Sequence, residues 1–505
     1  MTTTLPGADA PETDSVPELT AAERDALSAA PTDLLLDGTW TGSSTGGSFP
    51  VEDPSTGATL AHVADASEDD ARRALDTAVR VQGEWGRSAP RERSEILRRT
   101  YELMMADIDR LSLLMTLEMG KPLAESRAEV AYAADYFRWF AEEAVRFGGR
   151  FSSSPDGAAR ILTLKQPVGP VLLVTPWNFP LAMAARKVGP AIAAGCTVIV
   201  KAAKQTPLSM HAVARIMQEA GLPAGVLSLI TTSRSSKIVS AIIDDPRLRK
   251  LSFTGSTEVG RVLIQQSAAS LLRVSMELGG NAPFIVFDDA DIEHAADQAM
   301  LAKLRNNGEA CTAANRFLVH SSVVEQFSAA LVERFERVRV GRGSESGVTL
   351  GPLIDRVAVD KVQELVDAAV EAGATVAYRG EVPTGPGHWS APTVLTGVGR
   401  DSRVVTEEIF GPVAPIVAFD TDAEAMEIAN SSEYGLASYV FTADERRARW
   451  VYERLESGMV GLNRGVLSNP AAPFGGIKAS GFGREGGSEG IDEYLEIKYV
   501  AMNGV

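Results

Sequence analysis

The segment between residues 170 and 278 alternates short apolar runs with helical sequences, and this alternation constrains the fold more than any other feature. The apolar runs are PVLLVTP, TVIVKAA, VLSLI, KLSFTG and VSMEL. Helix-forming sequences separate them, including PLAMAARKVGPAIAAG and STEVGRVLIQQSAA. Strands and helices that alternate at this spacing predict an α/β protein with a doubly wound parallel sheet. A second alternating run, at about 282–478, predicts another α/β unit.

Capping signals predict where several helices begin and end. Thr20 and Glu23 have capping-box spacing, and Ser67 precedes three acidic residues that open a second helix. RERSEILRRTYELMMADIDRLSLLMTLEMG reads as one long helix closed by Gly120. Thr206 and Pro207 are predicted as the N-cap and first residue of the next helix after VIVK. The final segment, EYLEIKYVAM, alternates like a strand, whose open edge we expect to contact another subunit.

The net charge and the cysteine content indicate which binding partners and which cellular compartment to expect for this protein. The net charge of −17 disfavours nucleic acids and acidic membrane surfaces, although local arginines could still bind an anionic substrate. Two cysteines cannot form a disulfide framework, so a reducing, cytoplasmic location is expected. No apolar run reaches about 18 residues, and residues 1–17 resemble a flexible tail rather than an export signal.

Two glycine-containing stretches compete as a phosphate-binding turn. GFGREG at 481–486 matches G-x-G-x-x-G, but it follows FGGIKAS rather than a strand, so a flexible loop is predicted there. In KLSFTGSTEVGR a strand ends at Gly255 and a helix begins at Ser256–Thr257. Free N–H groups at such a helix start suit a diphosphate, and an ordinary strand-to-helix turn is the alternative.

Three short polar segments contain candidate catalytic groups. Cys196 lies among apolar residues and is predicted to be a core residue, whereas Cys311 follows the Asn-Asn-Gly turn of NNGEACTAANR. A partly exposed thiol there could be a nucleophile, or simply a surface cysteine. Asn178 in TPWNFP could donate to an oxyanion. Glu277 ends an apolar strand, where a half-buried carboxylate has a raised pKa and can act as a general base.

Six motifs together resemble the aldehyde dehydrogenase superfamily in order and spacing. They are VTPWNFP, FTGSTEVG, MELGGNAP, NNGEACTAANR, EEIFGPVAP and PFGGIKASGFGREGG, and the resemblance runs from about residue 35 to the end. It implies that Cys311 is the nucleophile, Glu277 the general base, and Asn178 with the backbone N–H of Cys311 the oxyanion hole.

The resemblance also implies the chemistry and a cofactor site. The thiolate would add to an aldehyde, the adduct would lose hydride to a nicotinamide, and water would release the acid from the thioester. No metal is expected, because the histidines and cysteines show no ligand spacing. The implied cofactor residues are Thr175, Pro176, Trp177, Lys201, Lys204, Gly255, Ser256, Leu278, Glu408 and Phe410.

Lys204 bears on the choice between NAD and NADP. In NAD-preferring relatives this position is often a glutamate, which repels a 2′-phosphate. Lysine has the opposite charge, so NADP is the predicted cofactor, with NAD possible. The alternative is that Lys204 points into solvent.

Within the superfamily, the sequence is similar to succinate-semialdehyde dehydrogenases. Arg186, Arg305 and Ser468 match the residues that hold the distal carboxylate of the substrate there. Arg186 could instead cap its helix, and Arg305 could pair with a surface acid. Asn469 and Pro470 depart from the subfamily pattern, and Ala313 replaces the second cysteine of a redox switch. Glutarate semialdehyde or a neutral aliphatic aldehyde is the alternative substrate, and a catalytically silent scaffold protein is the alternative class.

The resemblance implies three structural parts in a homodimer or homotetramer. The dinucleotide-binding domain is predicted at 18–149 and 169–279, and the catalytic domain at 280–479. A small β oligomerisation element is predicted at 150–168 and 480–505.

Overall fold

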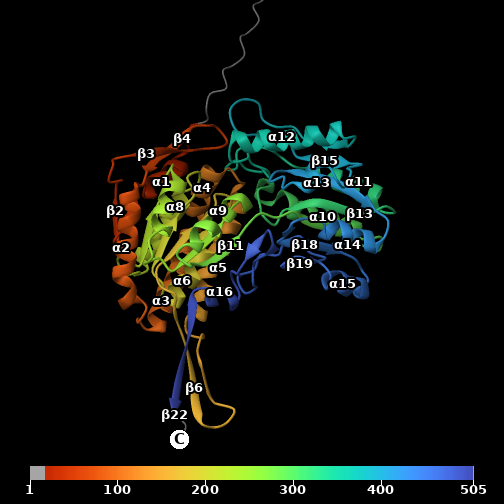
Figure 1. Ribbon diagram of the computed structural model, residues 1–505. Helices are drawn as coiled ribbons and strands as arrows, with labels where there is room; N and C mark the ends of the chain where they lie inside the picture. Colours follow the sequence, from red (N-terminus) through yellow and green to blue (C-terminus); the bar gives the residue numbers. More distant parts are fainter. Residues whose placement is uncertain (1–17, 504–505) are drawn as a thin grey trace, which may run out of the picture.

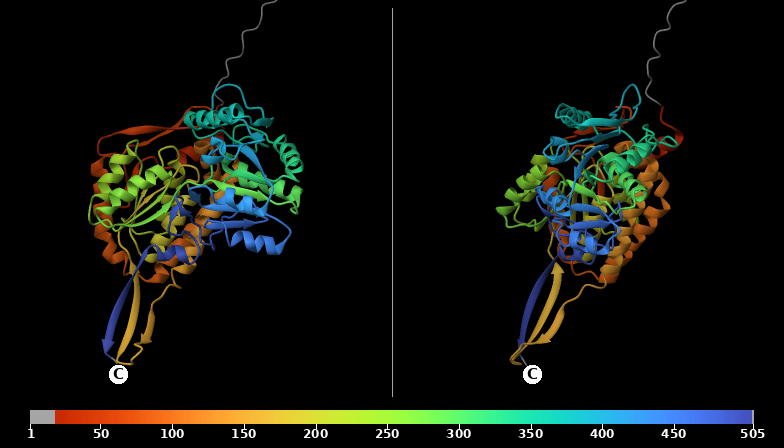
Figure 2. Two further views of the ribbon diagram at one scale, coloured as in Figure 1. Left: turned by 45° about the vertical axis from the view of Figure 1, so that its right-hand side comes forward. Right: turned by 90° about the vertical axis from the view of Figure 1, so that its right-hand side faces the viewer.

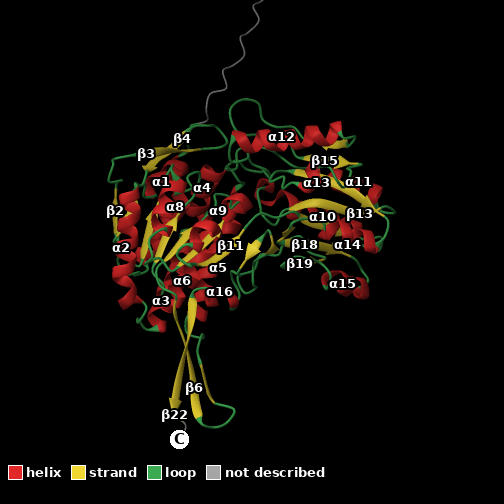
Figure 3. Ribbon diagram, viewed as in Figure 1, coloured by secondary structure: helices red, strands yellow, loops and turns green. Residues whose placement is uncertain are grey.

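The computed structural model describes residues 18–503, so the predicted tail at 1–17 lies outside the described residues. Two α/β bodies lie side by side, and a narrow β arm projects from the first (Figure 1). Helices cover the strands of each body (Figure 3). The α/β class predicted from the sequence is confirmed.

The first body is built on an eight-stranded sheet. Its order is β2-β1-β9-β8-β7-β10-β11-β21, and the five strands from β9 to β11 are parallel. The chain starts in the middle at β7, adds β8 and β9 on one side, and then adds β10 and β11 on the other, which is a doubly wound topology. The strands are β1 (Leu34–Leu36), β2 (Thr39–Thr41), β7 (Val171–Val174), β8 (Val198–Lys201), β9 (Leu227–Ile230), β10 (Lys250–Thr254), β11 (Arg273–Glu277) and β21 (Gly481–Phe482).

Both faces of this sheet are buried, which explains why its strands are continuously apolar. Val171 and Leu173 of β7 belong to one hydrophobic cluster, whereas Leu172 and Val174 belong to another on the opposite face. Alternate residues of a strand point to opposite faces, so apolar side chains are needed at every position. The helices are α1 (Ala21–Ala29), α2 (Glu68–Trp85), α3 (Pro90–Ala106), α4 (Ile108–Met119), α5 (Leu123–Glu143), α6 (Ala182–Ala194), α7 (Leu208–Glu219), α8 (Ser235–Ile243), α9 (Thr257–Ala268) and α16 (Glu489–Asp492).

The helix starts follow the capping signals in two cases and depart from them in a third. Capping boxes are present at Thr20 and at Ser67. The prediction for Thr206 and Pro207 is wrong by one residue, because α7 begins at Leu208 with Pro207 preceding it. The Thr206 hydroxyl instead donates to the carbonyl of Trp177, 3.0 Å away.

The single long helix predicted up to Gly120 is also wrong, because it breaks at Asp107 into α3 and α4. Asp107 has φ −106° and ψ 17°, and its N–H donates to the carbonyls of Leu103 and Met104. The sequence gives no sign of this break. No glycine or proline lies at it, and the apolar periodicity continues across it. Gly120 does end α4, in the left-handed conformation at φ 89°.

The second body contains a seven-stranded sheet in the order β14-β15-β16-β13-β12-β18-β19. All neighbours except β14 and β15 are parallel. The strands are β12 (Ala282–Val286), β13 (Ala314–His320), β14 (Thr375–Arg379), β15 (Thr393–Thr396), β16 (Val413–Phe419), β18 (Ala437–Phe441) and β19 (Met459–Leu462). The helices are α10 (Ile292–Leu304), η1 (Arg305–Gly308), α11 (Val324–Phe335), α12 (Arg356–Glu371), α13 (Arg403–Thr406), α14 (Asp422–Asn430) and α15 (Glu445–Tyr452).

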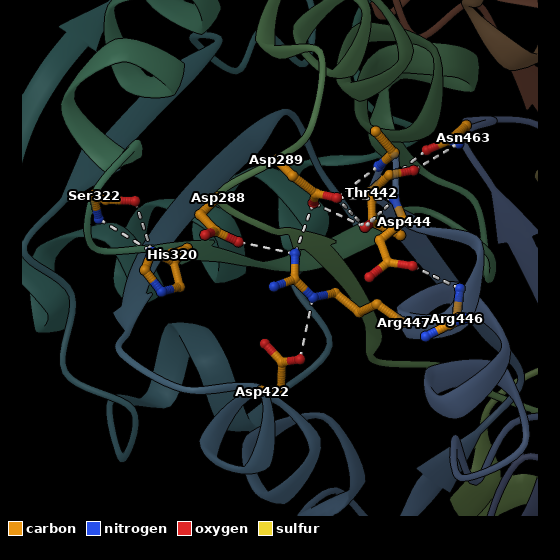
Figure 4. A network of polar contacts seen from close by, with 11 residues as sticks. Asp288, Asp289, His320, Ser322, Asp422, Thr442, Asp444, Arg446, Arg447 and Asn463 are labelled. Carbon is orange, nitrogen blue, oxygen red and sulfur yellow. Dashed lines mark hydrogen bonds and ion pairs between the residues drawn. The ribbon is translucent and has the colours of Figure 1, made fainter.

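The guanidinium of Arg447 on α15 contacts three carboxylates that follow strands β12 and β16 of this second sheet (Figure 4). Its guanidinium lies 2.8 Å from Asp288, 2.7 Å from Asp289 and 3.1 Å from Asp422. Asp289 also accepts a hydrogen bond from the Thr442 hydroxyl at 2.8 Å. One cation therefore joins the loops that follow β12 and β18 to the start of α14.

The projecting arm consists of β22 (Leu495–Asn503) paired antiparallel with β6 (Ala159–Pro167), which also pairs with β5 (Arg150–Ser153). It stands clear of both bodies in two further views (Figure 2). The terminal strand thus has a partner within its own chain. Phe151, Ile497 and Tyr499 remain 64%, 70% and 60% exposed on the arm.

The glycine-rich segment at 481–486 corrects a prediction. Gly481 and Phe482 form β21, which pairs antiparallel with Glu277 and Met276 of β11 rather than remaining a flexible loop. At Gly481 φ is 107°, and a Cβ would lie only 2.0 Å from the Met276 carbonyl oxygen. Two shorter strand pairs complete the described chain, β3 (Ser48–Glu52) with β4 (Thr59–Ala64) and β17 (Tyr434–Gly435) with β20 (Ile477–Lys478). In residues 18–503 no helix combines the length and apolar character needed to cross a bilayer.

Candidate active site

A cavity of about 260 Å³ collects residues that follow strands β7, β10 and β11 of the first body and residues that precede strands β13 and β16 of the second. Nine of its lining residues were predicted from the sequence: Pro176, Trp177, Asn178, Gly255, Ser256, Leu278, Cys311, Glu408 and Phe410. Six were not predicted: Met183, Thr254, Gly279, Ala358, Lys361 and Ile409. Ala358 and Lys361 come from α12, whose sequence shows only an ordinary amphipathic helix and so gave no signal.

The turn before Cys311 is buried, whereas the sequence suggested an exposed polar turn. Asn306, Asn307 and Gly308 are consecutively left-handed, with φ of 58°, 60° and 79°. Both asparagines are only 1% exposed. Asparagine and glycine tolerate this conformation better than other residues, and a Cβ at Gly308 would lie 2.5 Å from the backbone of Gly411. Asn306, Asn307 and Gly308 therefore form a buried, tightly packed turn that positions the Cys311 thiol.

Asn178 is held by contacts to both its side chain and its backbone. Its Nδ2 donates to the carbonyl of Glu309 at 2.9 Å. Its own carbonyl accepts from Lys121 Nζ and from Asn306 Nδ2, each at 2.9 Å. Lys121 is buried and is neutralised by Glu129. One N–H of the Asn178 amide remains available to a ligand in the cavity, because an amide nitrogen carries two hydrogens.

The surroundings of Cys311 favour the protonated thiol. The side chain is partly exposed at the cavity wall, while the protein around it excludes most solvent. Loss of water raises the pKa of the Cys311 thiol to about 12, the guanidinium of Arg186 lowers it, and Glu408 and Glu277 raise it further. The thiol therefore needs a base or an added positive charge before it can attack.

Glu277 ends β11 as predicted, but it is more deeply buried than the half-buried carboxylate expected. It is 3% exposed, and neither carboxyl oxygen has a hydrogen-bond partner among the described residues. Burial raises the pKa of Glu277 well above its usual value, and the nearby carboxylate of Glu485 raises it further. Arg186 and Lys187 oppose this effect. Glu277 does not line the 260 Å³ cavity, and it faces Gly475, where a Cβ would lie 2.9 Å from Oε1.

One wall of the cavity has the features of a dinucleotide site. Ser256 caps the twelve-residue helix α9, and a Cβ at Gly255 would lie 2.4 Å from the ring of Phe253. The Val259 N–H donates to the Ser256 side chain, and the other N–H groups of the first turn of α9 can donate to a phosphate.

The opposite wall contains a carboxylate and two aromatic rings. Glu408 Oε1 accepts from the Gly280 N–H at 3.0 Å, and burial raises the pKa of Glu408 to about 7. Phe410, at φ 56°, stands edge-on to Trp177 with ring centroids 5.6 Å apart. Lys361 Nζ donates to the Glu408 carbonyl at 2.7 Å.

The two lysines predicted for the cofactor lie outside this lining, at the end of β8. Lys201 is 6% exposed, whereas Lys204 is exposed. Burial lowers the pKa of Lys201 to about 8, and the charge of Lys204 lowers it further. Thr175 is buried beside them, and its N–H donates to the Lys201 carbonyl at 3.2 Å. Two neighbouring ammonium groups repel each other, so an anion between them would be favoured.

A second cavity, of about 200 Å³, brings together two of the three predicted substrate residues. Its lining residues are Glu125, Ala128, Glu129, Tyr132, Phe179, Arg305, Asn306 and Ser468. Arg305 forms no ion pair with any residue from 18 to 503, and its guanidinium lies 5.5 Å from the Phe179 ring centroid. The Arg305 guanidinium, which forms no ion pair among the described residues, is therefore a candidate binding group for an anion in this cavity.

Arg186, the third predicted substrate residue, lines neither of these two cavities. It is 1% exposed, with Nε 2.7 Å from Glu485 Oε2 and the guanidinium 3.9 Å from the Phe474 ring centroid. The charge of Arg186 is already paired, so a direct contact with a substrate carboxylate is not available in this arrangement. Arg186 influences the site electrostatically, through the pKa of Cys311.

The chain matches known proteins over most of its length. The model of the aldehyde dehydrogenase family matches residues 40–500. A succinate-semialdehyde dehydrogenase of Paenarthrobacter nicotinovorans is 53% identical over 443 residues, covering 88% of this chain and 98% of the relative. A glutarate-semialdehyde dehydrogenase of Pseudomonas aeruginosa is 45% identical over 470 residues, covering 93% and 97%. Among solved structures, an E. coli NADP-dependent enzyme superposes with a TM-score of 0.93 at 44% identity, covering 94% of this chain and 99% of that one.

Proposed function

Because the chain belongs to the aldehyde dehydrogenase family, we propose that it oxidises succinate semialdehyde to succinate, with NADP as its preferred cofactor. The observation that carries the substrate assignment is Arg305, an unpaired guanidinium among residues 18–503 in the same cavity as the hydroxyl of Ser468. A guanidinium recognises a carboxylate through two parallel hydrogen bonds, which a neutral aldehyde cannot accept.

Cys311 is the proposed nucleophile. Its thiol first loses its proton to solvent, and the thiolate then adds to the aldehyde carbon, so that the carbonyl oxygen becomes an oxyanion. The remaining Asn178 N–H and the backbone N–H of Cys311 are proposed to donate to that oxygen. Preorganised donors of this kind typically contribute about 2.7–4 kcal/mol each to the transition state. The nicotinamide supplies a hydride acceptor when the cofactor is bound.

Glu277 is the proposed general base for the second half of the reaction. The thioester on Cys311 is cleaved by water, and the Glu277 carboxylate takes the proton from that water. Burial raises the pKa of Glu277, and a carboxylate with a raised pKa is a stronger base. The oxidised product leaves as a carboxylate, and the thiol of Cys311 is restored.

The cofactor is proposed to lie between the start of α9 and Glu408. Ser256 and the α9 N–H groups would hold the diphosphate, Lys201 the adenosine ribose, and Glu408 the second ribose. Lys204 would pair with the 2′-phosphate. The exposed position of Lys204 next to the buried Lys201 supports the NADP preference.

Glutarate semialdehyde is the second candidate substrate, favoured by the relative from Pseudomonas aeruginosa. The two substrates differ by one methylene, and a pocket discriminates such a difference by roughly 10- to 200-fold. Succinate semialdehyde, glutarate semialdehyde and butanal should be compared by kcat/KM, with NADPH formation as the signal. We expect the order in which they are named. A higher kcat/KM for butanal than for either carboxylated aldehyde would reject the proposal.

We also propose that the arm formed by β5, β6 and β22 contacts a second copy of the chain in a dimer or tetramer, and that the enzyme works in the cytoplasm. The exposed apolar side chains of Phe151, Ile497 and Tyr499 support the first point. Light scattering of wild type and Ile497→Asp tests it, and an unchanged mass would count against it.

A further inference from the structure

The second cavity is lined by a tyrosine hydroxyl that shares a hydrogen bond with a buried neighbour. Tyr132 of α5 lines this cavity together with Arg305 and Ser468. Its hydroxyl oxygen lies 2.6 Å from that of Tyr136, one turn further along the helix. The two rings meet edge-on, with centroids 4.9 Å apart. A pair of hydroxyls at this distance shares one hydrogen bond, so one of the two hydrogens is left over.

Burial decides which tyrosine keeps the spare hydrogen. Tyr136 is fully buried, and its hydroxyl has no other hydrogen-bond partner among residues 18–503. If Tyr132 donated to Tyr136, the Tyr136 hydrogen would be left without an acceptor in the core, at a cost of about 1–3 kcal/mol. The satisfied arrangement has Tyr136 donating to Tyr132. The Tyr132 hydrogen is then free to point into the cavity.

Neither glutamate in the cavity takes this hydrogen. Glu129 is fully engaged, since Oε1 accepts from the N–H groups of Leu181 and Ala182 and Oε2 pairs with Lys121. Glu125 accepts from the Asn306 N–H through Oε2. No hydrogen bond joins either carboxylate to Tyr132. The cavity thus offers a guanidinium, a serine hydroxyl and a phenolic O–H from three separate segments of the chain.

We infer that Tyr132 is a specificity-determining residue, whose hydroxyl donates a hydrogen bond to the distal carboxylate of the substrate beside Arg305. The inference rests on the proposed function and extends it. Tyr136 acts as a positioning residue, because its donation fixes the direction of the Tyr132 O–H. An aldehyde without a distal carboxylate gains nothing from either tyrosine.

The test compares Tyr132→Phe with wild type on succinate semialdehyde and on butanal, which has the same carbon chain without the carboxylate. We expect kcat/KM for succinate semialdehyde to fall roughly 10- to 100-fold, mainly through KM, because a hydrogen bond to a charged group is lost. The value for butanal should stay within about 2-fold, since no contact to it is removed. The ratio of the two values in one preparation is independent of the folded fraction.

Two further measurements separate recognition from a structural effect. Succinate, added as an inhibitor of butanal oxidation, should inhibit Tyr132→Phe roughly tenfold more weakly than wild type. Tyr136→Phe keeps the Tyr132 hydroxyl but removes its fixed direction, so it should show a smaller loss confined to succinate semialdehyde.

The outcomes distinguish the two levels of the proposal. Equal losses on both aldehydes, or no loss on succinate semialdehyde, would overturn the role of Tyr132 while leaving the proposed function in place. Wild-type enzyme without any preference for the carboxylated aldehyde would reject the proposed function, and the Tyr132 assignment with it.

Discussion

The side-chain nitrogen of Asn178 lies 2.9 Å from the carbonyl oxygen of Glu309, two residues before Cys311. This hydrogen bond joins the loop after β7 to the loop that presents the thiol. Asn306 strengthens the link, because its Nδ2 donates to the carbonyls of both Asn178 and Glu309. The oxyanion donor and the nucleophile are therefore held in one rigid unit, although they lie more than 130 positions apart in the sequence.

Replacing Asn178 by alanine should lower kcat by roughly 10²- to 10³-fold, because one oxyanion donor is lost. KM should change much less, since the aldehyde oxygen carries little charge before attack. Steady-state kinetics with succinate semialdehyde measures both values. A change confined to KM would contradict the assignment of Asn178 to the oxyanion hole.

Alkylation of Cys311 in the free protein should be slow at pH 7 and should accelerate with pH. Because the pKa of the thiol is raised to about 12, roughly one thiol in 10⁵ is ionised at neutral pH. Mass spectrometry after iodoacetamide treatment over a pH series measures this. The same series with Cys311→Ser is the control and should show no alkylation at position 311; in a separate activity assay this variant should show no turnover. Fast alkylation at pH 7 that does not rise with pH would show that the thiolate is already stabilised without ligands.

The affinity for NADP should increase as pH rises through about 7 if Glu408 binds the ribose. The pKa of Glu408 is raised by burial to about 7, so the carboxyl is neutral below that pH and a charged acceptor above it. Equilibrium titration of NADP between pH 5.5 and about 8.5 tests this in Glu408→Gln and wild type. The glutamine variant should lose the rise in affinity through about pH 7 and keep the change near pH 8 that comes from Lys201. An identical profile in both proteins would assign the titration to another group.

Changing Lys204 to glutamate should reduce the ratio of kcat/KM for NADP to that for NAD by roughly tenfold or more, because a phosphate contact becomes a repulsion. Lys237→Glu makes the same change in net charge on the exposed face of α8 and serves as the control. If wild type already prefers NAD and Lys204→Glu leaves the ratio unchanged, the proposed cofactor preference is wrong.

Arg447→Met should lower the free energy of unfolding by about 1–3 kcal/mol while leaving kcat unchanged, because three carboxylates lose their common cation. Arg449 on the same helix is a matched control. It is 72% exposed and, among residues 18–503, pairs only with Glu453, so its replacement should have a much smaller effect. Urea unfolding of the two variants measures the difference. Equal effects would show that the cluster in Figure 4 adds nothing beyond a surface ion pair.

The sequence predicted the parts of this protein that depend on neighbours within a few residues. The capping box at Thr20, the helix starts at Ser67 and at Ser256–Thr257, and the helix end at Gly120 all depend on interactions within one helical turn. The alternation of apolar strands and helices has the same local origin. It was enough to predict the parallel sheet, and it placed Glu277 at the end of a strand.

Tertiary structure decided the features that depend on segments distant in the chain. The helix break at Asp107 leaves no trace in the apolar periodicity. From the sequence, Arg186 was predicted to bind a substrate carboxylate. In the structure it forms an ion pair with Glu485, about 300 positions later in the chain. The buried turn before Cys311 and the strand β21 also depend on contacts with distant segments, Gly411 and β11 respectively. A buried charge or turn takes its partner from whatever the fold brings beside it, and no local pattern specifies that partner.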